Sequence, residues 1–135
     1  MAEIIGLDTS LFVYLFEDHP RFGKRAARVF EMLQTGEARG IFSAIGMIEI
    51  LTGPKKCGRD DIALQYEHSL RTFPGLSVVG LNERIVWLAS DLRAKYGIKT
   101  PDSIHLATAI DAGAERFVTN DKSLTKVKEV RISLL

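Results

Sequence analysis

Short apolar runs recur along the chain and alternate with longer stretches in which apolar residues are spaced as on a helix. These runs cover residues 4–7, 40–43, 76–81, 116–119 and 130–134. Short runs with little polar alternation are typical of strands that are buried on both faces, as in a parallel sheet. The pattern therefore predicts a sheet built from strands at these positions.

The stretches between the strands combine helical spacing with residues that start and stop helices. The predicted helices cover residues 9–16, 20–35, 44–51, 59–73, 82–96 and 100–112, and a helical turn ends near residue 126. Thr100 is expected to cap its helix, with Pro101 in the first helical position. Residues 53–58, Gly-Pro-Lys-Lys-Cys-Gly, predict a polar break between two helices.

This alternation of strands and helices determines the expected fold class. Parallel strands joined by helices form βαβ units, whose crossovers are right-handed. The chain has no internal repeat, low-complexity tract or linker that would divide it. We therefore expect a single doubly wound α/β domain over residues 1–135, with a central parallel sheet.

Composition indicates a globular protein and excludes some functions. Hydrophobic residues make up 46% and charged residues 26% of the chain, close to the averages for soluble domains. The aromatic side chains of Phe12, Tyr14, Phe16 and Trp87 are expected in the core. The formal net charge of +1 excludes a protein that binds nucleic acid through bulk positive charge, although it is compatible with a local basic surface.

The single cysteine and the lengths of the apolar runs bear on location. Cys57 cannot form an intramolecular disulfide or a cysteine-rich zinc site, and we expect a reduced thiol. No apolar run reaches the roughly 18 residues of a membrane span, and the first residues lack the basic and apolar regions of a signal peptide. We therefore expect a cytoplasmic protein that does not bind membranes.

Four acidic residues from distant parts of the sequence fall where predicted strands end or the following helices begin. Asp8 directly follows the first strand, and Asp121 follows the fourth. Glu49 lies in the helix after the second strand, and Asp102 opens a later helix. Because ligands bind beyond the carboxyl ends of the strands in an open parallel sheet, these four carboxylates are candidates for one shared site.

Each acid also has a purely structural interpretation. Asp8 and Asp121 can cap the helix or turn that follows them. Asp102 can complement a helix dipole, which is favourable by a few tenths to about 1 kcal/mol. Glu49 stands among the apolar residues of 47–51, where we expect burial on nearly every helix face. A carboxylate is rare there unless it binds a metal, pairs with a lysine or arginine, or extends its side chain to solvent.

A shared site of four acids implies a cation. Like charges raise each other's pKa, and a divalent ion removes that repulsion. Oxygen ligands of this kind suit Mg²⁺ or Mn²⁺, which can activate a water against a phosphodiester and stabilise the leaving oxygen. His105, three residues after Asp102, lies on roughly the same helix face. It is either structural or a contact for phosphate or water.

Other kinds of active site lack their motifs. The sequence contains no G-x-G-x-x-G, no G-x-x-x-x-G-K-[ST] and no G-x-S-x-G, so dinucleotide binding, P-loop chemistry and the α/β-hydrolase type are disfavoured. A haloacid-dehalogenase-like enzyme would need a second aspartate two residues after Asp8, where this chain has Ser10.

Together the four acidic segments resemble the motifs of PIN domains, and length and order resemble the small VapC-like toxins of prokaryotic toxin–antitoxin pairs. The segments are residues 8–10, 43–51, 100–109 and 119–121. The resemblance implies a three-layer α/β/α fold and a Mg²⁺- or Mn²⁺-dependent ribonuclease. The metal-binding and catalytic acids that it implies are Asp8, Glu49, Asp102 and Asp121.

The resemblance also implies supporting residues and partners. Ser10 and Thr119 would support the site through hydroxyl hydrogen bonds, and Asn120 would hold the turn that presents Asp121. Gly46 and Met47 are not distinctive of the family. VapC-like proteins usually form homodimers and are neutralised by an antitoxin that occludes the site.

Two functions follow as hypotheses. The first is an endoribonuclease that hydrolyses RNA phosphodiester bonds with metal-activated water. The alternative is a non-catalytic module that binds RNA or a protein. Lys55, Lys56 and Arg59 either contact RNA or are only solvated, and the sequence does not identify the RNA target.

Overall fold

The computed structural model describes residues 2–135 and contains the expected alternation of strands and helices. The strands are β1 Glu3–Leu7, β2 Ala38–Ser43, β3 Leu76–Val79, β4 Arg116–Thr119 and β5 Arg131–Leu134. The helices are α1 Thr9–Phe16, α2 Gly23–Gln34, α3 Ala44–Lys56, α4 Asp60–Arg71, α5 Glu83–Tyr96 and α6 Thr100–Asp111, followed by the 3₁₀ helix η1 Lys122–Lys126.

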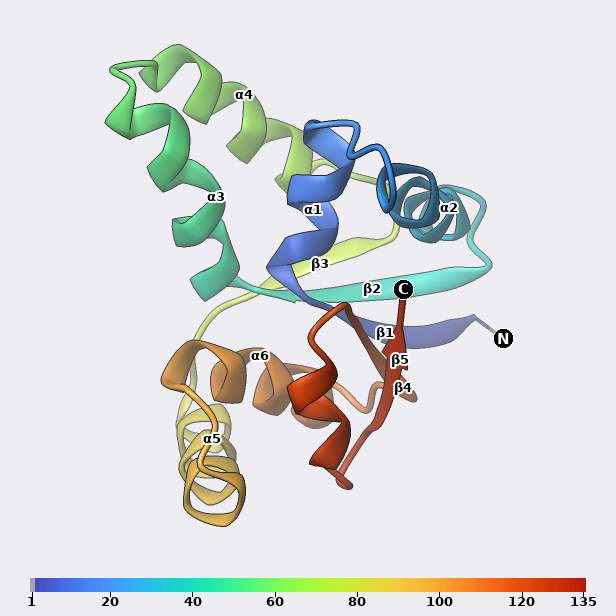
Figure 1. The fold of residues 1–135 in the computed structure, drawn as a ribbon, viewed down its shortest axis with the longest axis vertical. Helices are drawn as coiled ribbons and strands as arrows, with labels where there is room; N and C mark the ends of the chain where they lie inside the picture. The colour runs from blue at the N-terminus through green and yellow to red at the C-terminus, as the bar shows by residue number, and fades with distance from the viewer. Residues whose placement is uncertain (1) are drawn as a thin grey trace.

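The five strands form one parallel sheet in the order β3-β2-β1-β4-β5. Helices α1 to α4 lie on one side of this sheet, and α5 and α6 lie on the other (Figure 1). The doubly wound, three-layer α/β/α fold class is therefore confirmed. None of the helices in the described part of the chain combines the length and apolar character needed to cross a membrane.

Two hydrophobic cores hold the layers together. The larger cluster joins the sheet to α1, α2 and α3 and includes Ile5, Leu7, Phe12, Phe30 and Phe42. The second joins the sheet to α5, α6 and η1 and includes Ile85, Leu92, Leu106, Phe117 and Leu124. Burial of apolar surface on both faces explains why the strands are short apolar runs.

Gly6 allows α6 to pack directly against the central strand. A Cβ at this position would lie 2.5 Å from Ala109 Cβ and 2.9 Å from Phe117 Cδ1. Neither distance is compatible with a side chain larger than hydrogen, so this close approach requires glycine. This close packing places α6, which carries Asp102 and His105, against β1.

Helix α3 is longer than the sequence predicts. The predicted polar break over residues 53–58 is wrong for its first part, because the helix continues through Gly53 and Pro54 to Lys56. Pro54 removes only its own N–H donor, and its carbonyl accepts hydrogen bonds from the Cys57 and Arg59 backbone. The proline is therefore tolerated in the last turn.

Two helix starts also differ. Pro20 was expected in the first turn of a helix, but α2 begins at Gly23. Before it, His19 Nδ1 accepts hydrogen bonds from the backbone N–H groups of Arg21 and Phe22, both at 3.1 Å, and stabilises a turn. Helix α6 begins at Thr100 itself, so the predicted Thr100 cap is wrong by one position.

Aromatic residues do not all enter the cores. Phe12 is 1% exposed, as expected. Trp87 is 73% exposed and Phe16 is 36% exposed, so the expectation of core positions is wrong for these two. Trp87 lies on the face of α5 that points away from the second core. The apolar character of a side chain alone does not show whether it lies on the buried or the exposed face of a helix.

Candidate functional site

Asp8 is fixed at the point where the strand order reverses. Its backbone N–H donates to Val118 O at 3.1 Å, across the pair formed by β1 and β4. Its Oδ1 accepts from the Thr9 backbone N–H at 2.8 Å and caps α1, while its Oδ2 accepts from Thr119 Oγ1 at 2.6 Å. The capping interpretation and the site interpretation of Asp8 are thus compatible, because one carboxylate oxygen caps α1 and the other is held by Thr119 at the end of β4.

Thr119 connects Asp8 to Asp121. The fully buried Thr119 hydroxyl donates to Asp8 and accepts from the Asp121 backbone N–H at 3.0 Å. Asp121 Oδ1 accepts from the N–H and the hydroxyl of Ser123 at 2.9 and 2.7 Å, and so caps η1. Asn120 Nδ2 donates to Tyr14 Oη at 3.2 Å, which ties the turn to α1.

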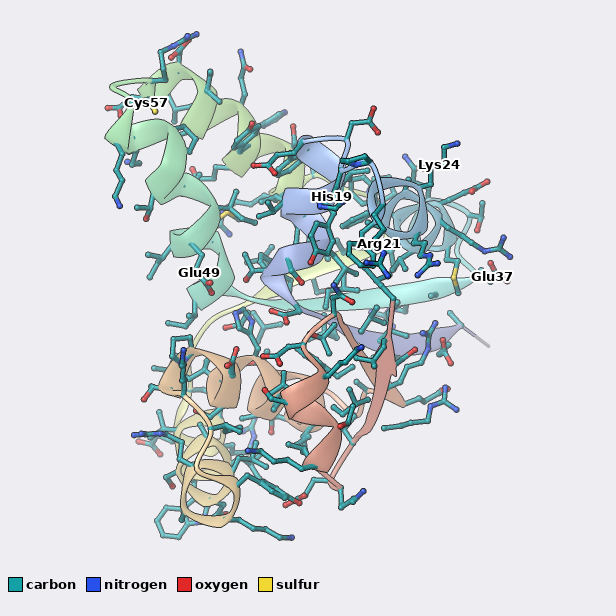
Figure 2. The ribbon with its side chains drawn as sticks, in the orientation of Figure 1. His19, Arg21, Lys24, Glu37, Glu49 and Cys57 are labelled. Atoms are coloured by element: carbon teal, nitrogen blue, oxygen red, sulfur yellow. The ribbon has the colours of Figure 1, made fainter. Side chains whose placement is uncertain are left out.

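Glu49 is held by residues from two other helices. Its carboxylate Oε1 accepts from His105 Nε2 at 3.0 Å and from Thr9 Oγ1 at 3.2 Å. The pKa of Glu49 is lowered mainly by the hydrogen bond from His105, against partial burial, which raises it. In Figure 2, Glu49 lies at the end of α3 nearest the sheet, and Cys57 lies at the opposite end.

The surroundings of Glu49 differ from the sequence expectation. The sequence left open a metal, a lysine, an arginine or a side chain that extends to solvent, and the structure pairs the partly exposed Glu49 with a histidine. The expectation of burial on nearly every face of its helix is wrong, because the Glu49 side chain is 46% exposed and Ile48 is 62% exposed.

The charges of the other three acids affect the pKa of Asp102. It lies in the first turn of α6, where partial burial raises its pKa, and the negative charges of Asp8, Asp121 and Glu49 raise it further. No hydrogen bond from another residue of the range 2–135 reaches its carboxylate, and only the charge of His105 acts in the opposite direction. Hydrogen bonds through Thr9 and Thr119 join Asp8 to Glu49 and to Asp121, and the charges of all three act on Asp102, so the four acids form one acidic cluster.

The donor set of this cluster fits a hard divalent cation. Among residues 2–135, no three carboxylate, imidazole or thiol groups are already gathered closely enough to enclose a metal ion. Mg²⁺ and Mn²⁺, however, keep several waters and need few protein carboxylates. Burial, and then the charges of the other acids, raise the pKa of Asp102, and a bound cation would favour its charged form against both effects.

The Ser10 hydroxyl differs from the expectation, and the neighbouring Thr9 hydroxyl has a contact that the sequence does not predict. Ser10 Oγ is buried and makes no hydrogen bond to any residue in the described range, whereas Thr9 Oγ1 contacts Glu49. Both residues stand in the first turn of α1, and spacing along the sequence does not determine which hydroxyl faces α3. His105 is 3% exposed, so the alternative of a contact with phosphate is not compatible with its position.

A groove runs from Glu49 along α1, α3 and α4. It has a volume of about 470 Å³, and its apolar walls include Val13, Phe16, Ile50 and Tyr66. Arg59 also lines it but is engaged with Asp61, whose Oδ2 lies 2.9 Å from Arg59 Nη2. Of the four acids of the cluster, only Glu49 lines this mainly hydrophobic groove, together with Glu17.

Comparison with known proteins identifies the class to which this fold and site belong. The family model of the PIN domain matches residues 5–130. The chain therefore belongs to the PIN domain family. A comparison with curated protein sequences finds no match.

Solved structures with the same fold include toxin–antitoxin proteins. VapBC2 from Rickettsia felis, bound to a DNA fragment from its promoter, has a TM-score of 0.78 at 18% identity, covering 97% of this chain and 98% of that chain. A toxin–antitoxin complex from Klebsiella pneumoniae has a TM-score of 0.72 at 23% identity, with coverages of 96% and 95%. VapC20 from Mycobacterium tuberculosis, a toxin that cleaves the sarcin–ricin loop, has a TM-score of 0.69 at 18% identity, with coverages of 96% and 99%. At these identities the likeness shows the fold.

Proposed function

We propose that this PIN domain is a Mg²⁺- or Mn²⁺-dependent endoribonuclease. The observation that carries the proposal is that hydrogen bonds through Thr9 and Thr119 hold Asp8, Glu49 and Asp121 together beside the reversal point of the sheet. The charges of these three acids also act on Asp102. A fold gains nothing from such repulsion, and perturbed carboxylates of this kind are typical of functional sites. The known activity of PIN toxins as nucleases agrees with this chemistry.

In this proposal the chain's own residues prepare the site for a cation. Asp8, Glu49, Asp102 and Asp121 would hold the ion. When bound, such an ion activates water and stabilises the charge that develops on the leaving oxygen. Asp8 is fixed in advance by Thr9 and Thr119, with both its oxygens hydrogen-bonded. Fixed donors of this kind avoid reorganisation during the reaction.

Cleavage of RNA by the parent and by Asp8→Asn tests this proposal. We expect the parent to cut RNA with Mg²⁺ or Mn²⁺ and to stop when EDTA is added. We expect Asp8→Asn to lose at least about a hundred-fold in rate, because the loss of a group that stabilises the reacting charge typically costs that much. The matched control is Asp91→Asn, the same change at an exposed position on α5, which should cut like the parent.

Two outcomes would contradict the ribonuclease proposal. Equal cleavage by the parent and Asp8→Asn would exclude the acidic cluster as the active site. No binding of Mn²⁺ at millimolar concentration, measured by calorimetry, would favour the non-catalytic binding module.

We further propose that the protein is the toxin of a toxin–antitoxin pair and works as a homodimer in the cytoplasm. Support comes from the toxin–antitoxin complexes among the similar structures and from the apolar groove that ends at Glu49, which suits an occluding protein segment. The exposed free thiol of Cys57 suits a reducing compartment. Co-purification with the product of an adjacent gene, and mass measurement in solution, test these assignments.

A further inference from the structure

We propose that His105 and Thr9 are positioning residues that hold the Glu49 carboxylate in the orientation needed to bind the cation. The inference rests on the proposed function, because it assigns a task to two residues beside the same acidic cluster. Neither residue is among the acids that would touch the ion.

The longer side chain of Glu49 needs hydrogen-bonding partners to hold its position, more than the aspartate side chains do. Its side chain is 46% exposed, and a glutamate loses more rotamer freedom than an aspartate when it is fixed. Asp8 is anchored by its own capping geometry, whereas Glu49 reaches out from the second turn of α3. Without partners, its carboxylate would sample several positions.

The contacts leave one carboxylate oxygen available. Oε1 accepts from both His105 Nε2, at 3.0 Å, and Thr9 Oγ1, at 3.2 Å. No residue in the described range hydrogen-bonds Oε2. With Oε1 held by two donors, Oε2 would be the oxygen left free to bind the cation.

Two donors, His105 Nε2 and the Thr9 hydroxyl, share the Glu49 carboxylate, while the buried His105 Nδ1 has no hydrogen-bond partner among the described residues. A carboxylate only accepts, so the short contact to Glu49 places a hydrogen on His105 Nε2. The Thr9 hydroxyl donates to Glu49, and its oxygen lies 3.2 Å from the same Nε2. Thr9 also donates its backbone N–H to Asp8, so one residue orients two of the proposed ligands.

The positioning groups are themselves rigid. The His105 ring is 3% exposed and stacks on Phe42, with ring centroids 5.9 Å apart and an angle of 20° between the planes. A Cβ on Gly46 would overlap the Phe42 ring and lie 2.8 Å from Thr9 Oγ1. The glycine thus leaves the space that the threonine hydroxyl needs to reach Glu49. Gly46 has this structural role although it is not distinctive of the family.

The arrangement differs from a histidine buried only for packing. The imidazole directs its N–H from the protein interior to a half-exposed carboxylate, in the manner of the outer residues that orient metal ligands. Loss of such outer partners typically weakens metal binding by about ten- to a hundred-fold. The effect is expected in metal affinity and not only in stability.

Calorimetric titration with Mn²⁺ of the full chain tests the proposal through pairs of variants. We expect Thr9→Val and His105→Leu each to weaken Mn²⁺ binding by about ten-fold. Thr9→Ser keeps the hydroxyl and His105→Gln offers a side-chain N–H of similar reach, so both should stay within about three-fold of the parent. In a Glu49→Gln background, His105→Leu should cause no further loss, because the group that it positions is gone.

The outcomes separate this inference from the proposed function. If the parent binds Mn²⁺ and the folded Leu and Val variants bind it equally well, the inference is overturned and the proposed function stands. If the parent binds Mn²⁺ with these differences but cuts no RNA, the inference stands and the ribonuclease proposal fails. If the parent binds no Mn²⁺, both are wrong. Thermal melts of each variant identify a loss of fold.

Discussion

At Asp102, burial and the neighbouring acids act against the charged form of the side chain. It is half-buried, no residue in the described range donates a hydrogen bond to its carboxylate, and three other acids act on it. The pKa is therefore raised in the folded chain, which means that the folded state holds a proton more readily than the unfolded state. Stability consequently falls as pH rises through that pKa.

We expect Asp102→Asn to stabilise the metal-free protein at pH 7 by up to about 1 kcal/mol, a small value because solvent screens a partly exposed group. The gain should disappear as pH falls below the ordinary aspartate value of 3.8, where both states are protonated. Urea unfolding in EDTA at both pH values measures this. Asp91→Asn is the control, and a loss of stability in Asp102→Asn at pH 7 would contradict the repulsion.

Two glycines of α3 provide a second test. Glycine to alanine normally stabilises a helix by roughly 0.5–1 kcal/mol. Gly53 has nothing within 4 Å of an added Cβ, and we expect Gly53→Ala to be neutral or stabilising. Gly46→Ala should instead destabilise by about 1–3 kcal/mol, because its methyl group collides with Phe42 and Thr9. Equal unfolding free energies in the two variants would contradict the packing described for Gly46.

Between elements, the end of β4 holds two acidic segments together through one hydroxyl. We expect Thr119→Val, which keeps the shape, to destabilise by about 1–3 kcal/mol, because the Asp121 N–H loses its acceptor. It should also weaken Mn²⁺ binding, because Asp8 loses its 2.6 Å hydrogen bond. Thr119→Ser keeps the hydroxyl and should have the stability and the Mn²⁺ affinity of the parent. Chemical unfolding and calorimetry measure the two effects, and an unchanged Val variant would show that the link is unimportant.

The elements also show what the sequence could predict. Strand positions and the four acids follow from local patterns, because buried parallel strands are apolar and a site lies where they end. The contact between Glu49 and His105 joins residues 56 positions apart, and nothing local encodes it. The choice of Thr9 over Ser10 and the exposure of Trp87 likewise depend on which face of a helix meets its neighbour, and this is decided by tertiary packing.

For the whole molecule, near-neutral charge arises from cancellation. The net charge is +1, yet four acids converge on one cluster, so the remainder of the chain carries a net positive charge. An acidic cluster within an otherwise mildly basic protein is compatible with a polyanionic substrate. The sheet order β3-β2-β1-β4-β5 produces this separation, because it brings Asp8 and Asp121 from opposite ends of the sequence to adjacent strand ends.

The most direct test of the account is sequencing of the new RNA ends that the protein produces in a cellular RNA pool. The parent and Asp8→Asn are each incubated with Mg²⁺ and with EDTA. We expect discrete new ends only for the parent with Mg²⁺. The same ends from Asp8→Asn, or from the parent in EDTA, would contradict a metal-dependent ribonuclease site built on the four acids.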